Sequence, residues 1–135
     1  MKKRTLWWIG MFIYLIFLFR ITVFRPGTVP VELFSGSLNL VPFSEYLRFA
    51  HNGSWGVFFY SFIGNILCFM PFGMILRQRD RKNRWFQALL LSILLSVLIE
   101  TLQYVLGTGV TETDDVILNT FGSALGYYLV NIMKD

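Results

Sequence analysis

Glu100 and the acidic turn formed by Asp114 and Asp115 carry the side chains of this sequence that are best suited to chemistry. Carboxylates in a cleft can accept a proton from a reacting group, so Glu100 and Asp115 are the candidate catalytic residues. Carboxylate oxygens are also the ligands that hard cations such as Mg²⁺ prefer, so Asp114, Asp115 and Glu100 are the candidate metal ligands. The sequence requires no cofactor at these residues. A bound Mg²⁺ ion is possible, and whether any metal is present is left open.

Two polar stripes place these carboxylates beside amide side chains. Spacings of three and four residues put side chains on one face of a helix, and each of two segments carries such a face. The stripes are Ser92, Ser96, Glu100 and Gln103 in one segment, and Asp115, Asn119, Gly122 and Gly126 in the other. Gly122 and Gly126 form a GxxxG step, which allows another helix backbone to approach closely. The spacing therefore predicts a polar site between tightly packed helices.

Structural roles are the alternatives to these functional interpretations. A carboxylate at the start of a helix commonly accepts hydrogen bonds from its first N–H groups, and such capping is expected of Asp114 or Asp115. Glu100 could instead form a hydrogen bond that locks two helices together. Asn65 and Asn119 are also suited to hydrogen bonds between helices. The residue types alone leave these alternatives open.

The rest of the chain is too apolar for an ordinary soluble domain. Hydrophobic residues make up 55% of the 135 and charged residues only 15%, which indicates a small membrane protein. Apolar segments lie at about 6–24, 57–76, 86–106 and 116–133, and each approaches the roughly 20 residues that a membrane-crossing helix needs. The sequence predicts an all-α membrane protein with a single domain over 1–135, a bundle of four transmembrane helices. Pro71 and Gly73 are predicted to bend or break the second helix near its inner end.

The distribution of basic residues predicts the orientation of the bundle. Residues 2–4 are all basic, and the connection 77–84 has five positive charges and one Asp. Cytoplasmic connections are enriched in Lys and Arg, so both termini are predicted to be cytoplasmic. The external connection 25–56 is rich in Pro and Gly turns. It is predicted to be a structured loop rather than a helix, with residues 38–49 along the membrane interface.

Depth in the membrane brings several polar residues to one level. At about 1.5 Å per residue, Arg20, Asn65, Glu100 and Asn119 fall roughly 6–12 Å below the outer boundary. An unpaired charge deep in the bilayer costs roughly 2.5–3.5 kcal/mol, so Glu100 needs compensation. Arg20 is its candidate partner, and the alternative is that burial keeps Glu100 protonated and neutral. The sequence predicts a polar cup that opens outward, with the acidic turn as its rim. The predicted binding residues are Asn65, Gln103, Asn119, Arg20 and Arg48, of which Arg20 or Arg48 would hold an anionic group of the ligand.

Three strings, GNILCFMPFG (64–73), SVLIETLQ (96–103) and TDDVILNTFGSALGY (113–127), resemble the VanZ-like family of small bacterial membrane proteins. A fourth string, LNLVPF (38–43), resembles the family's segment before the second helix, so the resemblance covers most of the chain. It implies a multi-pass protein of the bacterial cell membrane, in a family whose name-giving member lowers susceptibility to the glycopeptide teicoplanin. The positions that the resemblance marks as important are Asn65, Pro71, Gly73, Glu100, Gln103, Asp115, Asn119 and Gly122.

Three classes of function are consistent with these features. The protein could be an enzyme that acts on an envelope lipid, or it could bind such a lipid, a lipid-linked envelope component or a lipoglycopeptide without changing it. The third class is a non-catalytic partner or scaffold subunit of another envelope protein, which would dock through the GxxxG face. The chain has no recognisable nucleophile elbow, zinc motif or phosphate loop, so enzymatic activity is left open. It also has no basic arm large enough to predict binding to nucleic acid, and the oligomeric state is left open.

Overall fold

The structure is a computed structural model that describes residues 3–24, 32–79, 82 and 84–133. Its elements are α1 (Lys3–Thr22), β1 (Ser37–Asn39), α2 (Ser44–His51), α3 (Trp55–Arg79), α4 (Trp85–Leu106), β2 (Val110–Glu112) and α5 (Thr113–Ile132). The four predicted apolar segments correspond to α1, α3, α4 and α5. No helix end differs from its predicted position by more than three residues. The fold is therefore helical, with one short pair of strands added.

Helices α1, α3 and α4 are long and apolar enough to cross a membrane. Helix α5 also has 20 residues, but it is not among the helices of the described residues that are apolar enough to cross a membrane. The reason lies in its composition, since Asp114, Asp115 and Asn119 fall in its first two turns and lower its hydropathy. Asp114 and Asn119 are buried against other elements of the chain. The prediction of four spans thus has structural support for three, and α5 as a fourth span stays a prediction.

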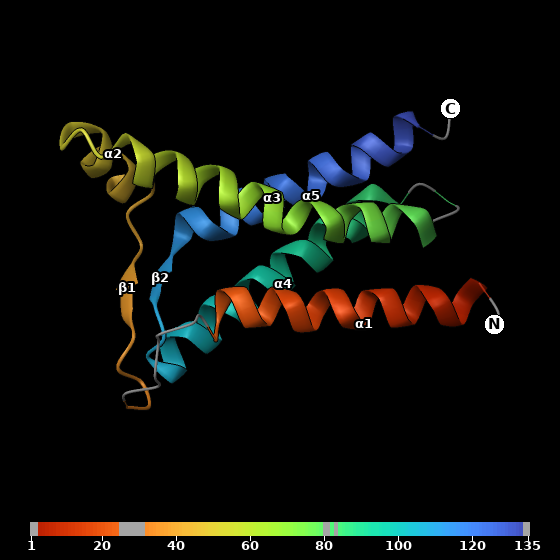
Figure 1. Cartoon of the computed structure of the whole chain (residues 1–135), viewed down its shortest axis with the longest axis horizontal. Coiled ribbons are helices and arrows are strands. Elements are labelled where there is room, and N and C mark those ends of the chain that lie inside the picture. The colour runs from red at the N-terminus through yellow and green to blue at the C-terminus, as the bar shows by residue number, and fades with distance from the viewer. Residues whose placement is uncertain (1–2, 25–31, 80–81, 83, 134–135) are drawn as a thin grey trace.

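The two ends of the molecule differ in what they contain. Figure 1 shows the start of α1, the end of α3, the start of α4 and the end of α5 at one end, and β1, β2 and α2 at the other. The start of α1 and the end of α5 lie at the same end of the molecule, as they must if both termini are on one side of a membrane. The cytoplasmic location of that side stays a prediction from the basic residues.

A cysteine introduced at Gly109 tests this orientation. Gly109 lies between α4 and β2, at the end that is predicted to face outward, and it is partly exposed. We expect Gly109→Cys to react with a membrane-impermeant thiol reagent in intact cells. Cells expressing the parent chain report any background reaction of Cys68, and detergent-solubilised protein shows that the new cysteine can be labelled. Labelling only after solubilisation would reverse the predicted orientation.

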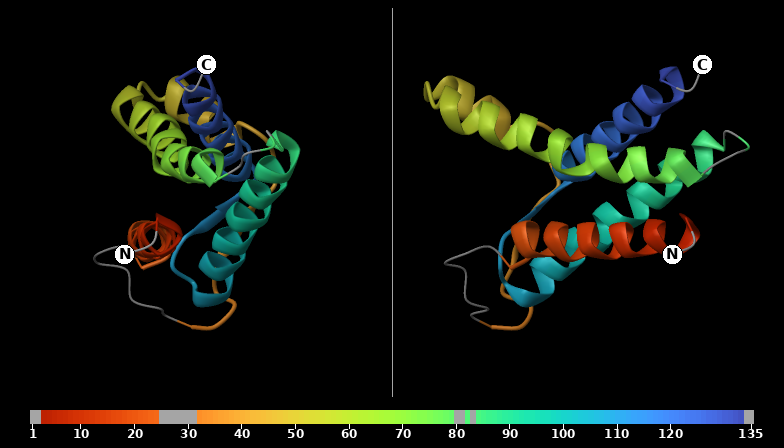
Figure 2. Two further views of the ribbon diagram at one scale, coloured as in Figure 1. Left: turned by 90° about the vertical axis from the view of Figure 1, so that its right-hand side faces the viewer. Right: turned by 45° about the vertical axis from the view of Figure 1, so that its right-hand side comes forward.

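Helices α3 and α5 form the most closely packed pair: they lie side by side in the left-hand view of Figure 2, and the right-hand view shows them crossing at an angle. Glycines make this approach possible. A Cβ on Gly122 would lie 2.2 Å from the backbone oxygen of Ile66, and one on Gly126 would lie 1.9 Å from that of Met70. On the facing helix, a Cβ on Gly73 would lie only 1.8 Å from the backbone oxygen of Ser123. The GxxxG step of the sequence is therefore occupied by α3 of the same chain.

The predicted interruption at Pro71 is not a break in the helix. Proline removes one backbone donor and disfavours a helix interior, which is why a break was expected. Helix α3 nevertheless runs without interruption from Trp55 to Arg79, with Pro71 inside it. Its close packing on α5 holds the turns on both sides of Pro71, so tertiary contacts outweigh the local preference.

The connection between α1 and α3, which is predicted to be external, contains a helix, and this corrects the prediction of a loop without one. Helix α2 places Tyr46 in edge-on contact with Phe58 and Phe62 of α3, at centroid distances of 5.4 and 5.6 Å. This packing of one aromatic face stabilises a helix of only eight residues that is too short to be stable alone. Gly53 follows α2 with φ of +69°, a left-handed backbone conformation that returns the chain into α3.

Strands β1 and β2 form a parallel pair in which Ser37 is opposite Val110 and Asn39 is opposite Glu112. The pair ties the external connection to the segment between α4 and α5. Strands of three residues have no measurable alternation of apolar and polar side chains, so no sequence pattern predicted them. Because β2 leads directly into α5, the ladder also fixes where α5 begins.

The apolar core lies where α1, α3 and α4 meet. Its fully buried members are Leu18, Val23, Phe69 and Ile99, which come from three helices and the residue after α1. Many other apolar side chains of these helices are exposed, among them Phe12 and Phe17 of α1 and Leu94 of α4. An apolar surface that faces away from the rest of the chain is what a membrane-spanning helix needs. The core beneath this surface positions the polar end of the molecule.

Candidate functional site

A cavity of about 630 Å³ lies at the end of the molecule that contains α2, β1 and β2. Five elements contribute to its wall: the end of α1, α2, the first half of α3, β2 and the first turn of α5. Its polar lining residues include Glu45, Tyr46, Tyr60, Asn65, Glu112 and Asp115. Apolar side chains, including Ile21, Phe49 and Val110, complete the wall. The cavity is therefore a polar, acidic site with an apolar surround.

Two of the predicted site residues meet on this wall. The Asn65 amide of α3 donates a hydrogen bond of 2.5 Å to Oδ1 of Asp115 in the first turn of α5. The close packing of α3 on α5 brings them together, since Ile66 follows Asn65 and contacts Gly122 of α5. Asp115 thus has one oxygen oriented by an amide while its carboxylate still lines the cavity.

Glu100 lies beside the cavity rather than on its wall. Its side chain is only 4% exposed, and Oε2 accepts a hydrogen bond of 2.9 Å from the backbone N–H of Glu112. Its backbone oxygen accepts another, of 2.8 Å, from the Thr111 hydroxyl. Glu100 therefore holds strand β2 against α4. Its carboxylate supports a wall of the cavity instead of contacting a ligand there.

Gln103 and Asn119 are also buried away from the cavity. The Gln103 amide donates to the backbone oxygen of Thr22 at 3.1 Å, and the Asn119 amide donates to the Ser96 hydroxyl at 2.9 Å. Both side-chain carbonyl oxygens are buried, without a hydrogen-bond partner among the described residues. The predicted stripe on α4 thus faces α1 and α5, and its members connect helices.

Asp114 has a different role from the capping that was expected of the acidic turn. Its side chain is 1% exposed, and Oδ1 accepts a hydrogen bond of 2.7 Å from the backbone N–H of Phe43. The N-cap position of α5 belongs to Glu112, which makes no side-chain capping hydrogen bond. Asp114 therefore fastens the start of α2 to the start of α5, and so it fixes the outer wall of the cavity.

The candidate metal ligands are not arranged to share an ion. Asp114 points to Phe43, Asp115 pairs with Asn65, and Glu100 accepts the Glu112 amide. Within the part of the chain that the structure describes, no three His, Cys, Asp or Glu side chains form a group that could hold a metal ion. The geometry of these carboxylates does not fit the Mg²⁺ site that their residue types allowed.

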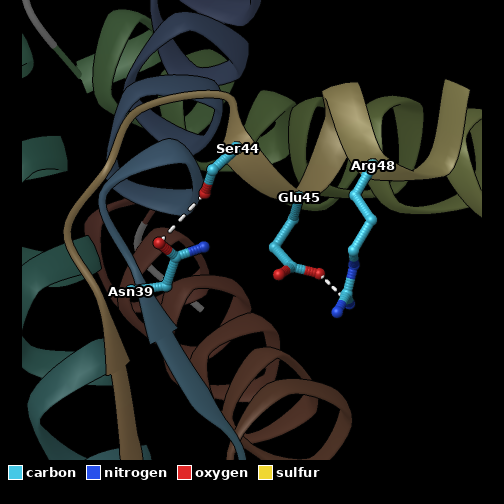
Figure 3. A network of polar contacts seen from close by, with 4 residues as sticks. All are labelled: Asn39, Ser44, Glu45 and Arg48. Atoms are coloured by element: carbon cyan, nitrogen blue, oxygen red, sulfur yellow. Dashed lines mark hydrogen bonds and ion pairs between the residues drawn. The ribbon is translucent and has the colours of Figure 1, made fainter. Parts of the chain in front are cut away.

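The two arginines predicted to bind an anionic group have partners elsewhere. Arg20 is exposed and donates to the backbone oxygen of Phe24, four residues further along, rather than reaching the buried Glu100. Arg48 forms an ion pair with Glu45 on the same face of α2, as Figure 3 shows. Neither arginine lines the cavity. The depth estimate placed Arg20 near Glu100 but could not show the direction of its side chain.

The electrostatics of the cavity centre on Glu112. Burial, followed by the neighbouring carboxylates of Asp115, Glu45 and Asp114, raises the pKa of Glu112 to about 7, while Arg48 opposes the shift. Glu112, Glu45 and Tyr60 were not predicted as site residues. Glu112 lies two residues before the acidic turn of Asp114 and Asp115, and its position in an extended strand was not apparent. Glu45 and Tyr46 lie in the connection that was expected to lack a helix.

Comparison with known proteins agrees with the resemblance seen in the sequence. A family model described as VanZ/LLP1 matches residues 11–134. Protein VanZ of Enterococcus faecium is 30% identical over 96 residues, which cover 71% of this chain and 53% of that protein. The chain thus spans about half the length of this curated relative. No solved structure matches.

Proposed function

Because the chain belongs to the VanZ-like family, we propose that it lowers bacterial susceptibility to teicoplanin by binding an envelope lipid or lipid-linked component in the cavity between α2, α3 and α5. The observation that carries this proposal is the Asn65 and Asp115 pair on the wall of a cavity of about 630 Å³. Such a volume falls within the range of small-molecule sites, roughly 300–1,000 Å³. Three apolar helices place this cavity in a protein suited to the membrane.

Binding of a ligand without a chemical reaction explains the positions of Glu100 and Asp115 better than acid–base catalysis at Glu100 does. A general base must come within hydrogen-bond reach of the proton that it removes. Glu100 is buried, and its carboxylate accepts the backbone amide of Glu112. Of the two predicted catalytic carboxylates, only Asp115 lines the cavity. The proposal therefore assigns binding to Asp115 and support of the wall to Glu100.

A partner or scaffold role is less well supported, because the surface that was expected to carry it is occupied. Gly122 and Gly126 lie against the backbone of α3. The GxxxG step therefore joins two helices of this chain, and it is not exposed for a second protein.

Teicoplanin susceptibility in a sensitive host tests the proposal. We expect the wild-type chain to raise the minimal inhibitory concentration, and Asp115→Asn combined with Asn65→Ala to abolish that rise. Glu100→Gln should retain protection, because the glutamine carbonyl can still accept the Glu112 amide. Glu32→Gln, which removes an exposed carboxylate outside the cavity, is the matched control. All variants must reach equal abundance in the membrane.

Lipid extracts of the same cultures separate binding from catalysis. We expect no lipid species to change with protection. A species that appears with the wild-type chain and disappears with the Asp115→Asn variant would replace binding by catalysis. Loss of protection in Glu100→Gln alone would move the functional site away from the cavity.

A further inference from the structure

We infer that the cavity holds the ammonium group of a lipophilic amine, through the carboxylates of Glu45, Glu112 and Asp115 and the hydroxyl of Tyr46. The inference rests on the proposed function and names the ligand class of that site. Four features of the cavity carry it: its charge, the spacing of its carboxylates, an unpartnered hydroxyl, and its mouth.

The sign of the charge favours a cation. Glu45, Glu112 and Asp115 line the cavity, and the described lining residues include no Lys or Arg. Arg48 pairs with Glu45, but its side chain is 61% exposed, so its charge is largely screened by solvent. A concave site lined by one sign of charge attracts the opposite sign and repels its own. An anionic headgroup is therefore disfavoured, although the sequence had predicted an anion held by Arg20 or Arg48.

The spacing of the carboxylates favours an organic cation over a metal ion. No three acidic side chains of the described residues are grouped closely enough to share a metal. They are instead distributed around a cavity of about 630 Å³ whose wall also contains the rings of Tyr46, Phe49 and Tyr60. Ammonium groups are bound by charge-assisted hydrogen bonds to carboxylates and by the faces of aromatic rings. Mixed acidic and aromatic walls are thus suited to an alkylammonium ion.

Tyr46 supplies an observation independent of the carboxylates. The residue is 4% exposed, and its hydroxyl has no hydrogen-bond partner among the described residues. Burial and then the carboxylates of Asp115, Glu112 and Asp114 raise the pKa of Tyr46, so the hydroxyl lies beside the acidic groups. The Asn65 amide lies close enough to the Tyr46 hydroxyl to oppose this rise in pKa, but the hydrogen bond that it donates goes to Asp115. A buried polar group without a hydrogen bond is destabilising, and a bound ammonium group could donate a hydrogen bond to the Tyr46 oxygen.

The mouth of the cavity favours a ligand with an apolar tail. Tyr60 of α3 lines the cavity and is 84% exposed, so the cavity opens beside it. On the same helix, Ile63 and Leu67 present exposed apolar side chains. A headgroup in the cavity would leave its tail against this apolar surface of α3.

The affinity for an ammonium group should depend on pH. Glu112 has a pKa of about 7, so it is largely ionised above pH 7 and largely protonated below it. The charged and titratable groups that face it or line the same cavity are Glu45, Tyr46 and Arg48 of α2, Tyr60 and Cys68 of α3, Glu100 of α4, and Asp114 and Asp115 of α5. Protonation of Glu112 removes one attractive charge, so cation affinity falls as the pH decreases through 7.

Titration of the purified chain in neutral maltoside micelles tests the inference. Calorimetry would compare dodecylamine with dodecanol, which has the same tail and no charge, and with butylamine, which has the charge and a short tail. At pH 8 we expect dodecylamine to bind roughly ten-fold or more tightly than either of them. At pH 6 its affinity should fall several-fold, because the amine stays protonated while Glu112 loses its charge.

Single substitutions separate the contributing groups. Glu112→Gln should lower dodecylamine affinity roughly ten-fold and remove the pH dependence. Tyr46→Phe, which keeps the ring, should lower the affinity by a smaller factor. Glu32→Gln, outside the cavity, should bind as wild type does. Each variant must first show the elution profile and melting temperature of the wild-type chain.

The remaining outcomes contradict the inference in distinguishable ways. Equal binding of dodecanol and dodecylamine would show apolar binding without recognition of charge. Butylamine binding as tightly as dodecylamine would identify a free amine as the ligand, and absence of binding would exclude amines. If the chain bound dodecylamine no more tightly than dodecanol or butylamine but still protected cells against teicoplanin, this inference alone would be overturned. Selective amine binding without protection would overturn the proposed function alone.

Discussion

Replacement of Gly73 by alanine is expected to separate α3 from α5 and to destabilise the whole chain. The added Cβ would lie 1.8 Å from the backbone oxygen of Ser123 and 2.8 Å from the backbone nitrogen of Tyr127. An ordinary carbon–oxygen contact is about 3.3 Å, so the two backbones would have to move apart by roughly 1.5 Å. Neither contact can be relieved by rotating a side chain, because both involve the backbone of α5.

The expected cost is about 3 kcal/mol or more, at the upper end of overpacking substitutions. The melting temperature of the chain in detergent micelles should fall by roughly 10 °C. Gly64→Ala, on the same helix, is the matched control, because nothing lies within 4 Å of its added Cβ. Alanine there should leave the melting temperature unchanged or raise it slightly through better helix propensity. Equal melting of the two variants would show that α3 and α5 can separate at little cost.

Replacement of Asp114 by leucine is expected to release α2 from the outer wall of the cavity. The substitution removes the acceptor of the Phe43 N–H, and a hydrogen bond to a carboxylate contributes about 1.5–3 kcal/mol. Phe43 has φ of +59°, a left-handed conformation that a bulky residue adopts only under constraint. Without its hydrogen bond, Phe43 should relax to an ordinary conformation and move the start of α2 away from α5.

Limited proteolysis with chymotrypsin measures this release, because α2 and the residues before it contain Phe43, Tyr46 and Phe49. We expect cleavage in this segment to become roughly ten-fold faster in Asp114→Leu, the factor that 1.4 kcal/mol of lost stability produces. Asp114→Asn keeps an oxygen that can accept the Phe43 N–H, so it should remain protected. If leucine and asparagine gave the same cleavage rate, the hydrogen bond to Phe43 would not be what holds α2 in place.

The apolar helices could be located from the sequence because each has enough apolar residues in a row to be recognised without tertiary information. Helix α2 could not, since its stability depends on the contacts of Tyr46 with Phe58 and Phe62 across a turn. Strands β1 and β2 are too short to show alternation, and each needs the other as a partner. The absence of a break at Pro71 has the same origin, since packing on α5 outweighs a local preference, and the alternative of a bend there stays a prediction.

The polar stripes could be predicted, whereas the direction of each side chain could not. Asn65 and Asp115 do meet on the cavity wall. Glu100 has the depth that was predicted for a site residue, yet its carboxylate is turned to the Glu112 backbone. Periodicity identifies a face of a helix, and only the neighbouring elements decide whether that face borders a cavity or another backbone.

The parallel ladder of β1 and β2 has a consequence for the order of events during biosynthesis. Ser37 pairs with Val110, so more than half of the chain's length separates the two partners. Contacts of such long separation form late, because the intervening chain must be ordered first. Helices α1, α3 and α4 are all synthesised before β2 exists. The cavity is therefore completed only after Asp115 has left the ribosome, and a nascent chain that stops before this point contains three apolar helices and no assembled binding site.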